Sequence, residues 1–393
     1  MKKPLFALLS FLITINTAFF IASHVVTNTY QTPPIPHIDF VQAELDSMSL
    51  DEKIAQMLVV ERTSPTFSPD ETIKLQTAPY GGYILMGESY STLAGTRSLT
   101  ETLQSTAKTP LIIATDEEGG LVQRLQSITD QSPTDIPDMY SVGETGDLEY
   151  AKAIGKILAE ELRVVGVNVD MAPDADVFSN PNNPVIGRRS FSEDPNIVAT
   201  MSEAVKEGLE ENGVTATFKH FPGHGDTDTD SHEGLPIINR TREELDKSDL
   251  IPFKNAIETG AQFIMVGHIA LPKVTSDNTP ATLSPKITTD LLRHELGYDN
   301  IIITDALNMG AITDNYAEPD SCIKAIQAGA DLLLMPPNPT LAEQTIKANI
   351  PESRINESVY RILKFKQNYL NYYQYLDPSY FGSPDHRSTI NNH

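Results

Sequence analysis

The sequence predicts an α/β fold, a (β/α)8 TIM barrel, because short apolar runs alternate with amphipathic stretches along most of its length. Short continuous apolar runs are typical of parallel strands that are covered on both faces. Eight strands that alternate with helices are expected to close into a barrel, and the chain is long enough for one with loop insertions. An open doubly wound sheet is the alternative, but no Gly-x-Gly-x-x-Gly motif opens any of the helical stretches. The eight runs are residues 57–60, 82–86, 111–115, 165–169, 215–218, 263–266, 301–304 and 332–335.

Residues 1–30 are expected to be a signal peptide or an N-terminal membrane anchor. Lys2 and Lys3 precede a mostly apolar run that continues to about Val26, as in export signals. The run approaches the roughly 20 residues that span a bilayer, so a cleaved signal and an uncleaved anchor both stay open. Residues 31–38 are then expected to be a tether. The protein is therefore expected to be exported, either secreted or anchored to the outer face of the cytoplasmic membrane.

The barrel itself is expected to occupy residues 39–376 as a single catalytic domain. Residues 150–165 place apolar side chains on one helical stripe, and residues 353–370 form a closing amphipathic helix. Residues 377–393 are expected to form a C-terminal tail.

The composition excludes several classes of function. It is 40% hydrophobic and 21% charged, as in an ordinary globular protein. The net charge of −24 argues against a nucleic-acid partner, because phosphate binding needs clustered Lys and Arg. The single cysteine, Cys322, excludes an internal disulfide and a cysteine-based zinc site.

Residues 219–236, which follow the fifth predicted strand, carry the strongest functional signal. They read Lys-His-Phe-Pro-Gly-His-Gly-Asp-Thr-Asp-Thr-Asp-Ser-His-Glu-Gly-Leu-Pro. Gly and Pro at this density break both the helical and the strand period, so the segment predicts a long loop. A loop that presents several histidines and aspartates from a rigid scaffold is a typical place for catalysis.

Other polar residues follow the ends of the predicted strands, where the active sites of such barrels lie. One end of the barrel is therefore expected to collect carboxylates, cations and imidazoles that could act on a polyhydroxylated substrate. These residues are Asp116 after the third run, Arg189 in an insertion after the fourth, Lys219 and His220 after the fifth, His268 after the sixth and Asp305 after the seventh.

Three stretches resemble glycoside hydrolase family 3, in its single-domain β-N-acetylhexosaminidase branch. They are residues 219–236, 304–309 (Thr-Asp-Ala-Leu-Asn-Met) and 116–120 (Asp-Glu-Glu-Gly-Gly). The motif at 219–236 is highly specific, and that at 116–120 is moderately so. The resemblance runs from about Leu50 to Pro336, and more loosely to Leu370.

The resemblance implies a role for each matching residue. Asp305 corresponds to the catalytic nucleophile, His232 to the general acid/base and Asp230 to the carboxylate that orients it. The sequence departs mildly from the family pattern at Glu117, where Gln is expected. Positions that bind the sugar correspond to Asp116, Arg124, Arg189, Lys219 and His220, and His268 is expected either to line the substrate site or to pack beside it.

Chemistry supports these roles. A retaining glycosidase needs a carboxylate that attacks the anomeric carbon and an acid that protonates the leaving oxygen. Histidine titrates near neutrality, so His232 could donate a proton in the first step and accept one from water in the second. Asp230, two residues away, could fix the tautomer of the ring.

Metal sites are the competing interpretation of the loop. Asp226, Asp228 and Asp230 have the spacing that opens an EF-hand, but Ser231 replaces the glycine and Ile237 the final glutamate of that motif. A hydrolytic metal cluster of His220, His224 and His232 with these aspartates is the other possibility. Neither is favoured, so no metal and no cofactor is expected.

The predicted function is that of a retaining β-N-acetylhexosaminidase, which removes terminal non-reducing β-linked GlcNAc. The resemblance suggests a peptidoglycan fragment, a muropeptide, as the substrate, and we expect a monomer. The alternatives are a β-N-acetylglucosaminide phosphorylase, because a neutral His would not repel phosphate, and a non-catalytic glycan-binding barrel.

Overall fold

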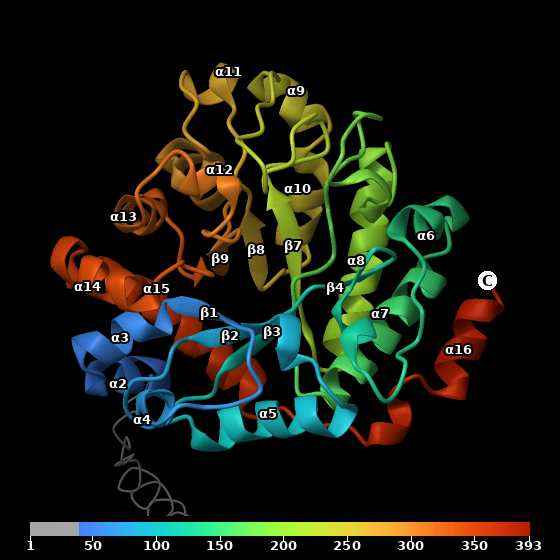
Figure 1. The fold of residues 1–393 in the computed structure, drawn as a ribbon. Helices are drawn as coiled ribbons and strands as arrows, with labels where there is room; N and C mark the ends of the chain where they lie inside the picture. The colour runs from blue at the N-terminus through green and yellow to red at the C-terminus, as the bar shows by residue number, and fades with distance from the viewer. Residues whose placement is uncertain (1–38) are drawn as a thin grey trace, which may run out of the picture. The chain divides into compact units, whose positions relative to one another are not determined.

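Eight parallel strands close into a barrel in the computed structural model, which describes residues 39–393 (Figure 1). The strands are hydrogen-bonded in the order β10-β1-β2-β3-β6-β7-β8-β9. A parallel bridge between Ile303 and Leu332 joins β9 to the residue before β10 and completes the ring. The predicted (β/α)8 barrel is therefore confirmed. The strands are β1 Leu58–Arg62, β2 Gly82–Leu85, β3 Ile112–Thr115, β6 Val169–Asp170, β7 Thr215–Phe221, β8 Phe263–Val266, β9 Ile301–Thr304 and β10 Leu333–Leu334.

Helices surround the barrel, and the connections that follow the strands carry the long loops (Figure 1). A short antiparallel hairpin, β4 Glu117–Gly119 with β5 Val122–Gln123, follows β3. The helices are α2 Phe40–Ser47, α3 Leu50–Gln56, α4 Pro69–Thr77, α5 Leu93–Thr106, α6 Met139–Thr145, α7 Leu148–Val164, α8 Pro195–Glu211, α9 Arg242–Lys247, α10 Leu250–Glu258, α11 Pro272–Thr275, the π-helix η5 Lys286–Glu295, α12 Gly310–Thr313, α13 Glu318–Ala328, α14 Pro339–Asn349, α15 Glu352–Phe365, the π-helix η6 Lys366–Leu370 and α16 Pro384–Asn391.

The fourth strand is the one whose predicted position is least accurate. The sequence predicts a strand over residues 165–169, whereas β6 holds only Val169–Asp170. Helix α7 continues to Val164, and Gly166 then takes a positive φ of 84° in the turn. The valines of this run are all buried, so their apolar character reflects the helix end and the turn as well as the strand.

Residues 377–393, the expected C-terminal tail, pack against the barrel. Phe381 is 1% exposed, and α16 packs against α7 (Figure 1). His386 of α16 lies between two carboxylates of α7: its Nδ1 is 3.1 Å from Glu161 and its Nε2 is 2.7 Å from Glu160. The expected tail, residues 377–393, is thus a folded part of the barrel domain.

This contact predicts a pH dependence for the C-terminal segment. Burial lowers the pKa of His386, but hydrogen bonds to Glu161 and Glu160 outweigh it, so the pKa is raised. The contact should therefore stabilise α16 fully below about pH 6.5, and weaken as the pH rises through the raised pKa. Amide hydrogen exchange over residues 384–391, corrected for intrinsic rates, should accelerate from about pH 6 to pH 9. His386→Ala should remove this pH dependence, and an unchanged profile would contradict the role of the ion pair.

The predicted signal or anchor and the tether, residues 1–38, lie outside the described residues. Among residues 39–393, no helix has both the length and the apolar character needed to cross a membrane.

Candidate active site

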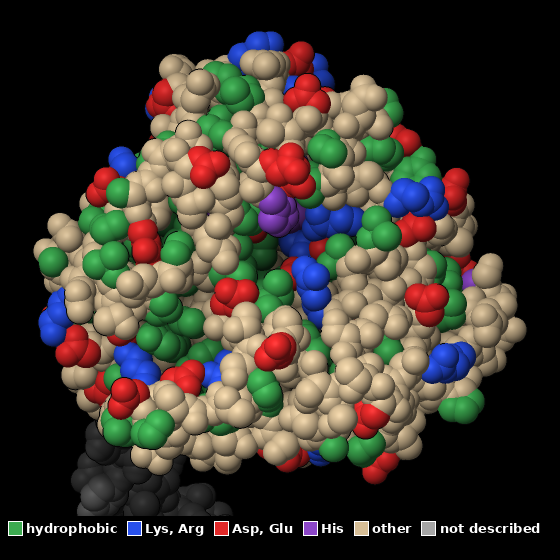
Figure 2. Space-filling model, viewed as in Figure 1, with side chains coloured by type: hydrophobic (Ala, Val, Ile, Leu, Met, Phe, Trp, Pro, Cys, Tyr) green, Lys and Arg blue, Asp and Glu red, His purple; other side chains and the backbone are tan. Residues whose placement is uncertain are grey.

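A cavity of about 480 Å³ opens at the carboxyl ends of the strands. Figure 2 shows it as a hollow near the centre of the face, where histidine, basic and acidic side chains gather. Its volume lies within the roughly 300–1,000 Å³ of small-molecule sites. Apolar side chains such as Met265 and Leu334 line part of it. Its polar lining includes Glu61, Asp116, Glu118, Arg124, Arg189, Lys219, His220, His224, Ser231, His232, Asp305 and Asn308.

A network of buried charges forms one wall of this cavity. The Nζ atom of Lys219 is 2.6 Å from Glu118 and 3.0 Å from Asp116. Arg189 donates two hydrogen bonds of 2.8 Å to the carboxylate of Glu118. Arg124 lies nearer the opening, with Nη2 3.8 Å from Asp116. The barrel thus brings together residues from the ends of β3 and β7 and from the short helix η3 Gly187–Arg189.

This network fixes the charge states of Glu118, Lys219 and Arg189. Burial raises the pKa of Glu118, but Arg189 and Lys219 outweigh it and hold the pKa well below its ordinary value. Burial lowers the pKa of Lys219 and of Arg189, but the neighbouring carboxylates, Glu118 first among them, outweigh burial, so the pKa of both groups is raised. The wall therefore presents fixed donors and acceptors, which suit the hydroxyl groups of a sugar.

Glu118 should matter for stability because it pairs with two buried cations. Glu118→Ala leaves Lys219 and Arg189 without their shared partner, so the free energy of unfolding should fall by about 3–5 kcal/mol. Urea denaturation measures this loss. Glu243→Ala, an exposed position in the first turn of α9, is the matched control and should change stability by less than about 0.5 kcal/mol. An equal loss in both variants would contradict the role of Glu118.

A second network lies beneath the cavity and holds the start of the long loop. Asp176 accepts hydrogen bonds from the N–H groups of His220 (3.2 Å) and His224 (2.6 Å), and lies 2.7 Å from Nδ1 of His220. Burial lowers the pKa of both histidines to about 4, so both rings are neutral at pH 7. Asp176 therefore orients His220 within the cavity wall.

Asp174, Asp176 and His220 could together hold a metal ion by their proximity. However, the guanidinium of Arg189 lies 3.5 Å from Asp174 and would repel a cation. Burial and the neighbouring Asp176 also raise the pKa of Asp174 to about 8, which favours its neutral form. A metal ligand needs the opposite properties, so the residues do not fit a metal centre.

Asp305 immediately follows β9 and reaches the floor of the cavity. Its Oδ1 accepts a 2.8 Å hydrogen bond from the N–H of Ala306, whereas its Oδ2 has no hydrogen-bond partner among residues 39–393. Burial raises the pKa of Asp305, but His268, His220, the Ala306 N–H and Lys219 together lower it. The carboxylate is thus ionised and has one unengaged oxygen, as a nucleophile requires.

His268 lies behind Asp305 rather than in the cavity wall. The side chain is fully buried; Nδ1 is 2.8 Å from Thr282 Oγ1, and Nε2 is 2.9 Å from the carbonyl oxygen of Ala306. Of the two roles expected for His268, the structure favours packing over direct contact with a substrate.

The loop after β7 carries His232 and Asp230 to the opening of the cavity. Nδ1 of His232 lies 2.8 Å from Oδ1 of Asp230, and the His232 side chain is 62% exposed. Burial raises the pKa of Asp230, but hydrogen bonds from His232 outweigh it and the pKa is lowered. An ionised Asp230 fixes the proton of the ring on Nδ1, which leaves Nε2 to exchange protons with a substrate.

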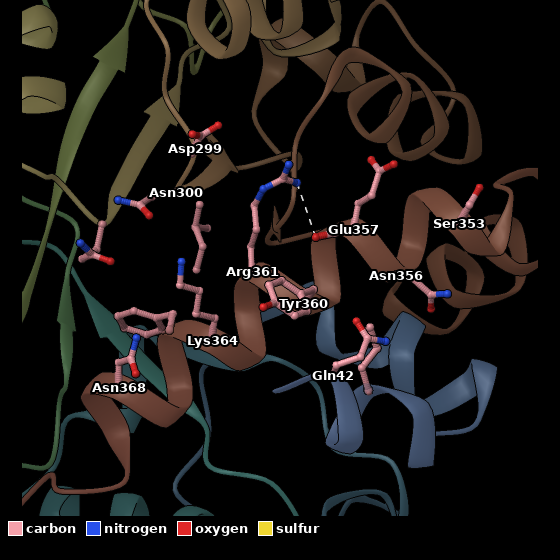
Figure 3. A pocket seen from close by; sticks show the side chains of 14 residues that line it. Gln42, Asp299, Asn300, Ser353, Asn356, Glu357, Tyr360, Arg361, Lys364 and Asn368 are labelled. Carbon is pink, nitrogen blue, oxygen red and sulfur yellow. Dashed lines mark hydrogen bonds between the residues drawn. The ribbon is translucent and has the colours of Figure 1, made fainter. Parts of the chain in front are cut away.

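A second cavity, of about 550 Å³, lies at the opposite end of the barrel among α2, α15 and the loop before β9 (Figure 3). It is slightly larger, but it holds none of the predicted site residues. Its charged side chains include Arg361, which donates to the carbonyl of Glu357 (Figure 3). Arg361 also donates to Asp331. Because barrel enzymes react at the carboxyl ends of their strands, we assign the chemistry to the first cavity.

Sequence reasoning located most of this site but missed the supporting carboxylates. Apart from His268, the residues that the sequence places at the strand ends all line the cavity. Glu118 lies inside the motif at 116–120, but the motif by itself gives it no role. Asp174 and Asp176 also follow a strand, so the rule of polar residues at strand ends could have identified them.

Comparison with known proteins agrees with this geometry. Residues 49–365 match the family described as "Glycosyl hydrolase family 3 N terminal domain". The chain is 40% identical over 291 residues to beta-hexosaminidase A of Pseudoalteromonas piscicida, covering 69% of this chain and 48% of that protein. The chain therefore spans about half the length of that relative.

Solved structures are similar as well. A glycoside hydrolase family 3 beta-N-acetylglucosaminidase from Paenibacillus sp. str. FPU-7 superposes with a TM-score of 0.82 at 33% identity, covering 88% of this chain and 68% of that one. A beta-glucoside phosphorylase, BglX, superposes with a TM-score of 0.80 at 26% identity, covering 89% and 65%. The resemblance inferred from the three motifs is confirmed: this chain belongs to glycosyl hydrolase family 3.

Proposed function

We propose that this protein is a retaining β-N-acetylhexosaminidase that removes terminal β-linked GlcNAc from the non-reducing end of glycans. The observation that carries the proposal is the ionised carboxylate of Asp305: one oxygen accepts a hydrogen bond, and the other has no partner in the described part of the chain. The His232–Asp230 pair at the opening of the same cavity supports it. The names of the similar proteins support GlcNAc as the sugar.

The reaction then proceeds in two displacements. Asp305 Oδ2 attacks the anomeric carbon and the glycosidic C–O bond breaks. The doubly protonated ring of His232 gives its Nε2 proton to the departing oxygen and keeps its Nδ1 proton hydrogen-bonded to Asp230. In the second step His232 takes a proton from water, whose oxygen attacks the anomeric carbon and releases Asp305. Lys219, Arg189, Asp116 and His220 hold the sugar hydroxyls during both steps.

A peptidoglycan fragment is our proposed natural substrate, with GlcNAc linked to N-acetylmuramic acid. Arg124, near the opening of the cavity and 42% exposed, is suited to bind an anionic aglycone. Comparing release of GlcNAc from a muropeptide and from the uncharged disaccharide chitobiose tests this. A preference for chitobiose, unaffected by Arg124→Ala, would contradict it.

A substrate assay with and without phosphate tests the reaction itself. A nitrophenyl β-N-acetylglucosaminide should release free GlcNAc at the same rate in either buffer. The similarity to a beta-glucoside phosphorylase favours phosphorolysis as the second candidate, and a GlcNAc 1-phosphate product would establish it. Binding of the sugar with no release would instead indicate a glycan-binding barrel.

Location and assembly are further parts of the proposal. We propose that residues 1–30 direct export, and that the barrel acts as a monomer outside the cytoplasm. A protein that lacks residues 1–30 should be soluble, elute at the size of one chain and keep full activity, because the lining residues of the cavity that belong to the described range, 39–393, all lie after residue 60. Full-length protein should fractionate with membranes or outside the cell, and a cytosolic location would contradict the proposal.

A further inference from the structure

Ser231 is a buried residue in a part of the long loop whose neighbouring residues are accessible to solvent. It stands between Asp230 and His232, the two members of the dyad, yet it is only 3% exposed. The side chains of its neighbours are 28% and 62% exposed. A small polar residue that is buried between two exposed functional residues fixes the loop where the dyad is presented.

Two hydrogen bonds hold Ser231, and they lead to different parts of the barrel. Its Oγ lies 3.2 Å from Nε2 of His224, the buried histidine at the start of the loop. Its carbonyl oxygen accepts a 3.1 Å hydrogen bond from the N–H of Ala311. Ala311 follows Asp305 by six residues, so this bond joins the dyad's loop to the segment after the nucleophile.

His224 is itself fixed, so it forms a rigid support for Ser231. Its Nδ1 lies 2.9 Å from Thr227 Oγ1, and its N–H donates to Asp176. Burial lowers the pKa of His224 to about 4, and the neutral ring has one donor and one acceptor nitrogen, which match its two hydroxyl partners.

Gly310 provides the space for the same contact. A Cβ atom at this position would lie 2.6 Å from the carbonyl oxygen of His232, a backbone atom that cannot rotate away. The φ of Gly310 is not positive, so close approach, rather than backbone conformation, requires glycine here. The backbone of the acid/base residue therefore rests directly on the segment that follows Asp305.

We propose that Ser231 and Gly310 are positioning residues that set His232 relative to Asp305. The proposal deepens the proposed function and rests on it. Ser231 links the Asp230–His232 pair to His224 on one side and to Ala311 on the other. Gly310 lets the backbone of its own segment approach the backbone of His232. Proton transfer depends steeply on this placement, since a shift of about 1 Å can cost on the order of 10²-fold in rate.

Leaving-group dependence separates positioning from a merely structural role. Ser231→Ala and Gly310→Ala should each lower kcat/KM for chitobiose by about tenfold to a hundredfold. The same variants should retain the wild-type rate of the first step with a dinitrophenyl β-N-acetylglucosaminide, whose leaving group needs little protonation. Gly234→Ala is the matched control, because its Cβ would meet only a Thr229 methyl group at 3.7 Å, and should resemble the wild type on both substrates.

The His232→Ala background provides the second test. If Ser231 and Gly310 act through His232, neither substitution should slow the His232→Ala enzyme further. Equal losses on both substrates, additive losses in that background, or no loss on chitobiose would each overturn the proposal. If His232→Ala itself cleaves chitobiose as fast as the wild type, the proposed acid/base role of His232 is refuted. That result is distinguishable from a failure of the positioning proposal. If Gly310→Ala does not fold, Ser231→Ala, which adds no atoms, decides alone.

Discussion

Asp305→Ala should lose on the order of 10⁴-fold of the activity of the enzyme, because the first step then has no nucleophile. The loss should be similar for nitrophenyl glycosides and for disaccharides, since both must form the same glycosyl-enzyme. Initial rates on the two substrates measure it. Within residues 39–393 the side chain accepts one hydrogen bond, from the N–H of Ala306, so the variant should fold and keep a melting temperature near that of the wild type.

Chemical rescue distinguishes a missing nucleophile from a damaged site. Azide should enter the space left by the carboxylate and restore turnover, giving a glycosyl azide of inverted anomeric configuration. A 2-deoxy-2-fluoro glycoside should label Asp305 in the wild-type protein, with the adduct located by mass spectrometry. Labelling of Glu118 or Asp116, or a product inverted by the wild-type enzyme, would refute the assignment.

His232→Ala should show a loss that depends on the leaving group. Cleavage of chitobiose should fall by about 10²–10⁴-fold, because a basic sugar oxygen must be protonated as it departs. The first step on a dinitrophenyl glycoside should change little. Burst kinetics on the activated substrate should then show accumulation of the glycosyl-enzyme, because the second step also lacks its base.

Asp230→Asn should lower activity in the same direction, since Asp230 lies 2.8 Å from Nδ1 of His232. The double variant should be little worse than His232→Ala, because both residues act as one unit. Asp228→Asn is a suitable control: it changes the same residue type two positions earlier, on an exposed part of the loop. Additive losses, or an equal effect of Asp228→Asn, would mean that the dyad is structural.

The strands and the strand-end residues could be predicted because both depend on local patterns. A parallel strand covered on both faces must be apolar along its length, and all eight runs contain or touch a strand of the barrel. The rule that barrel sites lie at the carboxyl ends of strands then selected Asp116, Lys219 and Asp305. The exception, the run 165–169, shows the limit of this signal, because buried helix ends and turns are apolar too.

The supporting contacts could not be predicted because they join residues far apart in the chain. Glu118 bonds Arg189 across 71 residues, and Asp176 bonds His220 across 44. No periodic pattern encodes such pairs. In the same way, residues 377–393 carry too weak a pattern to reveal that His386 reaches Glu160, 226 positions earlier.

The barrel and the long loop after the fifth strand could be read from the sequence, and the family motifs predict which residues have chemical roles. Local composition and spacing suffice for these features, since each lies within one strand or one loop. How these features come together depends on contacts between distant parts of the chain. Closure of the ring brings the loops after β3, β7 and β9 to one cavity, where burial amplifies their charges. It also places Ser231 between His224 and Ala311, which joins the loop that carries His232 to the segment after Asp305.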